Sequence, residues 1–268
     1  MNVRKSLIIY FKYLRIGFLS RIEYKLDFIT GVIGVLILNV TDLLLIGILL
    51  SNFHSIGGWS VWQIVFLYSF YLAAMGLQNI FTLHLNEIEN YVQDGTFDQF
   101  LVRPIPPFLQ LIAKEINHKN FNHLIIGIIG LVISYQQLNL NWSFGMFLWF
   151  ILLLLSGALV LAGIVLGLNS LAFWTVKSNV FIFGTGELQE AVQHYPLKIF
   201  GKWFEAFLTF LLPFGFINYY PSLILLDKTQ EALNPIIPYL TPIISVVILL
   251  IGFSIWSLGI KNYQSTGT

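Results

Sequence analysis

Four apolar stretches, each long enough to cross a bilayer, constrain the fold of this chain more than any other feature. A hydrocarbon core of about 30 Å is crossed by roughly 20 helical residues. Stretches of at least that length with few charges are residues 28–50, 61–85, 144–175 and 236–260. Only 10% of the 268 residues are charged, against about 25% in a typical soluble domain. We therefore expect an all-α integral membrane protein.

Two less regular stretches complete a prediction of six spans. Residues 203–226 form the predicted fifth span, and it is expected to be bent or partly re-entrant because proline frees backbone carbonyls that need protein or water. Its helix-disrupting residues are Pro213, Gly215 and Pro221. The predicted third span, residues 116–136, begins with polar side chains, so its first half is expected at an interface or inside protein.

The distribution of basic residues predicts the orientation. Cytoplasmic loops retain Lys and Arg. Six spans with the amino terminus in the cytoplasm place 13 of the 14 basic residues on that side and leave only Lys228 outside. On this prediction Lys177, Lys198 and Lys202 lie inside, between the fourth and fifth spans, and both termini are cytoplasmic.

The first 27 residues predict an amphipathic interface helix rather than a signal peptide, because six basic residues are spread through them. One apolar stripe at helical spacing includes Leu7, Phe11, Leu14 and Phe18. This helix either anchors the chain to anionic lipid or docks a cytosolic partner. Residues 28–268 then form one membrane domain.

The sequence does not contain the residues or motifs that several classes of function require. The chain has no cysteine and no phosphate-binding loop, and its net charge of +1 is not that of a nucleic-acid-binding protein. His118 and His123 are five residues apart, which does not place them on one helical face as a zinc pair. We therefore expect no catalytic residues, no metal site and no nucleic-acid partner.

Polar side chains at membrane depth are candidates for a pathway or for packing, because a buried polar group there needs a partner. Asn39 and Asp42 share one face of the first span and could line a cavity or bond across a subunit interface, although the favoured alternative is that Asp42 reaches water near the outer end. Asn169 in the fourth span favours a helix-to-helix hydrogen bond. Small residues that indicate close packing there are Gly157, Gly163 and Gly167.

The connection between the second and third spans, residues 86–107, is the most specific feature. It predicts a short helix that Gly95 ends, followed by an extended proline-rich exit. Its acidic residues are Glu87, Glu89, Asp94 and Asp98, and its apolar residues include Phe97, Phe100 and Leu101. We expect these apolar residues to be exposed, which favours helix-in-groove contact with a cytosolic protein, because the acidic residues disfavour an anionic lipid surface. The alternative is that the segment lies flat on lipid.

Two motifs give this chain a resemblance to a known family. The first is Gly95-x-Phe97-Asp98-x-x-Leu101-x-Arg103-Pro104, and the second runs from Leu212 through Pro213, Gly215 and Asn218 to Pro221. With them, the chain resembles the type 2 permeases of ATP-binding-cassette (ABC) exporters, in particular the bacterial branch related to multidrug or viologen export.

The resemblance implies a permease subunit that is not itself an enzyme and needs no cofactor, since a separate cytosolic ATPase binds ATP and Mg²⁺. Two identical or related permease chains would pair in the bacterial inner membrane and export an apolar or amphiphilic substrate. The interface helix would brace the docking, and Pro213, Gly215 and Pro221 would shape an outer gate. The implied ATPase-coupling residues are Glu87, Glu89, Gly95, Phe97, Asp98, Leu101, Arg103 and Pro104.

Two other functions stay open at this point. An ion-coupled secondary transporter would use Asp42, Glu205 and His84 as proton or cation carriers, although no inverted repeat supports it. A membrane-embedded enzyme acting on lipid substrates would use Glu115, His118 and His123.

Overall fold

The structure is a computed structural model, and every described residue with regular secondary structure is helical apart from one isolated bridge between Ile56 and Trp59. The described residues are 30, 33–34, 36–41, 55–113, 121–175 and 179–264. The predicted interface helix, with Leu7, Phe11, Leu14 and Phe18, lies outside them, as do Asp42 and most of the first predicted span.

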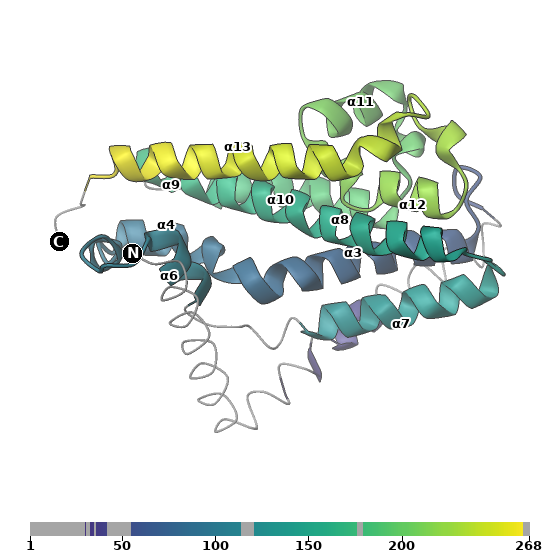
Figure 1. The fold of residues 1–268 in the computed structure, drawn as a ribbon, viewed down its shortest axis with the longest axis horizontal. Helices are drawn as coiled ribbons and strands as arrows, with labels where there is room; N and C mark the ends of the chain where they lie inside the picture. Colours follow the sequence, from purple (N-terminus) through teal and green to yellow (C-terminus); the bar gives the residue numbers. More distant parts are fainter. Residues whose placement is uncertain are drawn as a thin grey trace.

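Three long helices run side by side in the same direction (Figure 1). They are α3 (Val61–Thr82), α8 (Phe144–Ser170) and α13 (Thr241–Asn262). Together with their short extensions they are the three helices, among the described residues, that are long and apolar enough to cross a membrane. They match the predicted second, fourth and sixth spans. The Ser143 hydroxyl caps α8 by accepting from the Met146 amide, and the Gln63 side chain caps the start of α3 by accepting from the Ser60 amide.

Helix α7 (Phe121–Gln137) packs antiparallel to α3 through small residues. A Cβ added at Gly127 would lie 2.5 Å from the backbone nitrogen of Ala73, so only glycine permits this approach. The α8–α13 crossing is equally close, because a Cβ at Gly163 would lie 2.8 Å from the backbone of Ile248. A Cβ at Gly157 would likewise lie 2.5 Å from the carbonyl oxygen of Ile217, whereas one at Gly167 would make only ordinary van der Waals contacts.

Helix α10 (Asn179–His194) was not among the predicted spans, and it runs antiparallel to α3. The Gln189 amide donates to the Tyr71 hydroxyl at 2.6 Å, and the His194 ring stacks on Tyr68 with centroids 4.7 Å apart. The chain therefore returns along the bundle between α9 (Ala172–Thr175) and residue 195.

The predicted fifth span is a re-entrant hairpin. It consists of α11 (Lys202–Phe210), η4 (Pro213–Phe216) and α12 (Tyr219–Leu225), with a bend of 75°. Lys198 lies just before the hairpin and Glu231 just after it, yet their Nζ and Oε2 atoms are 3.9 Å apart. Because both ends of the hairpin meet, residues 203–226 turn back on themselves. The predicted bend is confirmed, whereas a full crossing by these residues is not supported.

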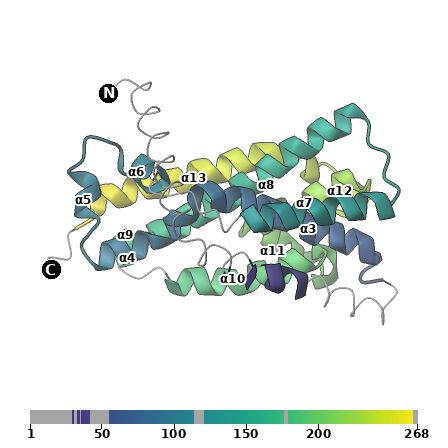
Figure 2. The ribbon, with the colours of Figure 1, turned by 90° about the horizontal axis from the view of Figure 1, so that it is seen from below.

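The two ends of the bundle can now be defined. The loop end carries α4 (Ile88–Gln93), α5 (Asp98–Leu101) and α6 (Pro107–Ala113), and the hairpin end carries α11 and α12 (Figure 2). Lys198 and Lys202 lie with Lys228 at the hairpin end, so the predicted separation of 13 basic residues from Lys228 is wrong. Six spans would require α7, α10 and the first segment to cross as well, and they remain a prediction.

Candidate functional site

The loop end is built around the turn that follows α4. Gly95 has φ +66°, a conformation that favours glycine, and its amide donates to the Val92 carbonyl at 3.4 Å. The amide of Phe97 donates to the Tyr91 carbonyl at 3.0 Å. The predicted helix stop at Gly95 is therefore confirmed, and the turn directs the Phe97 side chain back toward the bundle.

Phe97 is fully buried in an aromatic cluster at this end. Its ring lies 4.9 Å from that of Phe173 and 5.1 Å from that of Tyr263, measured between centroids, and Trp256 completes the enclosure. Phe100 is also buried. The expectation that Phe97 and Phe100 are exposed is wrong, because the ends of α9 and α13 supply the groove that these rings occupy.

The longest exposed run of the loop is the corner formed by Leu101, Val102, Arg103 and Pro104, which we call the 101–104 corner. Leu101 is 43% exposed and Val102 84% exposed. The Gln110 amide holds the corner in place by donating to the Phe100 carbonyl at 2.8 Å and to the Ile105 carbonyl at 2.6 Å. The 101–104 corner is thus an exposed, mostly apolar surface with one arginine, and Gln110 holds it in a fixed position.

The acidic residues of the loop do not form one exposed face. Glu89 is buried and accepts a hydrogen bond from Gln93 at 2.9 Å. Glu87 accepts from the Tyr91 hydroxyl and lies 3.7 Å from His84. Asp94 is exposed and Asp98 half-buried. These contacts give Glu87 and Glu89 roles within the loop.

The polar candidates at membrane depth make contacts within the chain. Asn169 donates to Asn86 Oδ1 at 3.1 Å, which ties α8 to the start of the loop. Asn39 is buried, and its Nδ2 lies 3.1 Å from His123 Nδ1 on α7. Both residues therefore serve helix packing in the structure.

The described residues do not bring together the side chains that an ion-coupled transporter or a membrane-embedded enzyme would use. Glu205 is buried in α11 at the hairpin end, whereas His84 lies at the loop end, and Asp42 falls outside the described residues. Of the proposed enzyme residues only His123 is described. Within the described part of the chain, no three His, Asp or Glu side chains are placed to hold a metal ion.

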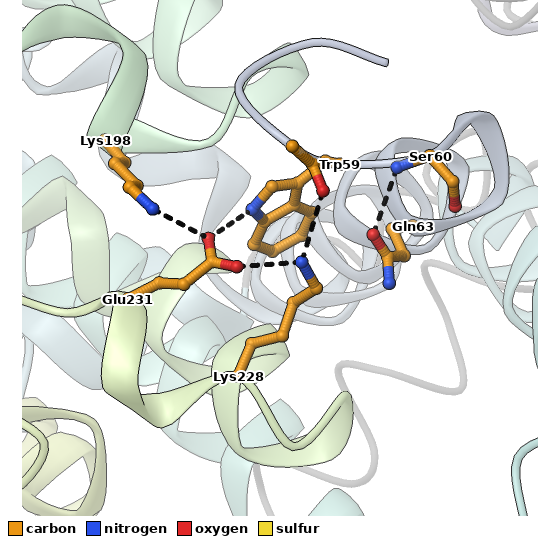
Figure 3. Close-up of polar contacts among 7 residues, drawn as sticks. Trp59, Ser60, Gln63, Lys198, Lys228 and Glu231 are labelled. Atoms are coloured by element: carbon orange, nitrogen blue, oxygen red, sulfur yellow. Dashed lines mark hydrogen bonds and ion pairs between the residues drawn. The ribbon is translucent and has the colours of Figure 1, made fainter. Parts of the chain in front are cut away.

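At the hairpin end, four residues form a partly buried polar cluster that we call the Glu231 clasp: Trp59, Lys198, Lys228 and Glu231 (Figure 3). The Trp59 indole donates to Glu231 Oε2 at 2.8 Å, and Lys228 Nζ lies 2.8 Å from Glu231 Oε1. The Lys228 ammonium also lies 5.2 Å from the centroid of the Trp59 ring, within reach of a cation–π contact. The clasp joins the turn before α3 to both ends of the hairpin.

The clasp favours the ionised form of Glu231. Burial raises the pKa of Glu231, but the hydrogen bonds from Lys228 and Trp59 and the charges of Lys228 and Lys198 lower it more. The pKa of this carboxyl therefore lies below its ordinary value. The clasp could not be predicted from the sequence, because Trp59 and Lys198 are far along the chain from Lys228 and Glu231.

The three predicted gate residues lie inside the folded hairpin. Pro213 starts η4, Pro221 is buried in α12, and a Cβ at Gly215 would lie 2.8 Å from Leu197. Thr209 and Tyr220 hydroxyls share a hydrogen bond of 2.5 Å between the two arms. These residues shape the hairpin, and their role in gating remains a prediction.

Comparison with known proteins adds one finding. A family model described as "ABC-2 family transporter protein" matches residues 36–267, a region that includes the loop end and the hairpin. No curated protein and no solved structure matches the chain.

Proposed function

Because the chain belongs to the ABC-2 transporter family, and is thus a multi-pass membrane permease component without catalytic activity of its own, we propose that it is the permease subunit of an ABC exporter. A separate cytosolic ATPase binds ATP and Mg²⁺ and powers it. The substrate is apolar or amphiphilic and leaves from the cytoplasm or the inner leaflet. The resemblance to multidrug or viologen export permeases supports this choice of substrate class.

The 101–104 corner is the observation that carries the proposal. Protein interfaces draw most of their affinity from a few apolar, aromatic or arginine side chains that enter a partner's pocket. Leu101, Val102 and Arg103 are exposed together, and Gln110 braces the corner. The ATPase docks on this corner, while Phe97 and Phe100 support it from inside.

The loop end faces the cytoplasm of a bacterial cell, with both termini on that side of the inner membrane. Six basic residues in the first 27 support this orientation. The lysines at the hairpin end are compatible with it, because Lys198 and Lys228 both lie beside Glu231. A second permease chain, identical or related, completes the transporter, and the hairpin forms its outer gate.

Docking is tested by Val102→Asp in membranes that also contain the ATPase, identified by its mass and its ATP hydrolysis. We expect co-purification of the ATPase and ATP-dependent export to fall at least tenfold, because a carboxylate cannot enter an apolar pocket without a large desolvation cost. Ile236→Asp makes the same kind of change at the hairpin end, where Ile236 is exposed, and should leave co-purification intact.

The purified chain alone should hydrolyse no ATP. If Val102→Asp left both ATPase binding and export unchanged, the corner would not be the docking surface. If transport continued without ATP and stopped with the proton gradient, the chain would be an ion-coupled transporter instead.

A further inference from the structure

An apolar groove of about 450 Å³ runs between α8, α13 and the break in the hairpin. Its walls include Val247 and Ile251 of α13, and Phe210 and Pro213 of the hairpin. Gly163, Gly167 and Gly252 also line it, where α8 and α13 approach each other. Thr209 supplies the one polar side chain among the lining residues.

The groove lies at the depth of the hydrocarbon core. It is lined by the second half of α8 and by much of α13, two of the helices able to cross the membrane. Beside the groove, α13 exposes further large apolar side chains, with Ile243 63% and Leu250 60% exposed. The groove is therefore continuous with a surface that has the character of a lipid-facing one.

The opposite edge of the bundle differs in polarity. Figure 2 shows α10 along one edge of the bundle and α13 toward the other. Glu187 and Glu190 are exposed on α10, and carboxylates at membrane depth face protein or water rather than hydrocarbon. The α10 edge is thus the one suited to a second chain or an aqueous path, which leaves the α13 edge, with its groove, to lipid.

We infer that the groove is a binding site for one acyl chain of a membrane phospholipid. A flexible hydrocarbon chain matches its nearly complete lack of polar groups. Bound there, the chain lies against Phe210–Pro213, where the hairpin changes direction, and fills the space that the bend leaves beside α8. This inference concerns lipid alone and does not depend on the proposed transport function.

The test uses the full chain in lipid nanodiscs doped with a phospholipid that carries a diazirine on its acyl chain. After illumination, we expect adducts on Val247, Ile251 and Phe210 to exceed several-fold those on Ile243 and Leu250, which contact only mobile lipid. Val247→Trp fills the groove and should reduce the adducts on the remaining groove residues, Ile251 and Phe210, to the level seen on Ile243. Val246→Trp, outside the groove on the same helix, should leave them unchanged.

Native mass spectrometry in mild detergent provides a second measurement. One phospholipid should remain on each wild-type and Val246→Trp chain and be lost from Val247→Trp. Equal labelling inside and outside the groove, insensitive to Val247→Trp, would overturn the inference. So would efficient disulfide cross-linking of two chains through Ile251→Cys, because a second copy would then cover the groove.

Discussion

Phe97 is the single side chain on which the loop end depends most. It is fully buried against Phe173, Trp256 and Tyr263. Phe97→Ala should lower the free energy of unfolding by about 3–5 kcal/mol, since truncating a buried aromatic leaves a cavity. Leu101→Ala, at a partly exposed position, should cost less than about 1 kcal/mol. Denaturant unfolding of both variants in the same detergent measures the difference, and equal losses would contradict the burial of Phe97.

Glu231 is the residue whose ionisation matters most at the hairpin end. Glu231→Gln should destabilise the protein by about 1.5–3 kcal/mol at neutral pH, because two charge-assisted or buried hydrogen bonds weaken. The folded-state pKa of Glu231 is depressed, so the clasp is fully effective above about pH 4.3 and is lost as the pH falls below it.

Thermal unfolding as a function of pH tests this prediction. The difference between wild type and Glu231→Gln should be present at about pH 7 and shrink progressively as the pH falls below about 4.3. Asp227→Asn removes a charge from the same loop at an exposed position and should change little. A difference that persisted at low pH would show that the charge of Glu231 is not what stabilises the clasp.

The sequence could predict individual residues where the cause is local. Gly95 ends a helix because of its own backbone freedom, and its φ of +66° confirms that prediction. The burial of Phe97 could not be predicted, because Phe173 and Tyr263, which cover it, come from the ends of two other helices. The Glu231 clasp could not be predicted either, because its residues also come from distant parts of the chain.

Among the helices, the α8–α13 crossing depends on glycine. Gly163→Ala should cost about 1–3 kcal/mol, because its Cβ would lie 2.8 Å from the backbone of Ile248, which cannot move away cheaply. Gly184→Ala in α10 is the matched control, since nothing lies within 4 Å of the added Cβ. It should stabilise the helix by up to about 1 kcal/mol. Unfolding measurements on both variants should show opposite signs, and a neutral Gly163→Ala would mean that the crossing is looser than described.

Long, uniformly apolar helices could be predicted, and three of them stand where hydropathy placed them. Helix α10 could not, because Glu187, Gln189 and Glu190 interrupt its apolar character. Hydropathy also does not reveal direction. Residues 203–226 are apolar enough to cross, yet the break before Pro213 turns them back.

At the scale of the whole molecule, the topology can be tested directly because the chain contains no cysteine. Single-cysteine variants Lys202→Cys and Asp227→Cys should react with an impermeant maleimide from one side of the membrane, and Arg103→Cys from the other. Labelling of Lys202→Cys from the same side as Arg103→Cys would show that residues 203–226 cross after all.

The burial of Phe97 has a mechanical consequence. Its ring packs among side chains of α9, α13 and the residue that follows α13. If the ATPase docks at Val102 as proposed, a displacement there would move α9 and α13 together with the loop, because close-packed cores shift as units rather than deform. The long helix α13 would then transmit that displacement toward the hairpin end.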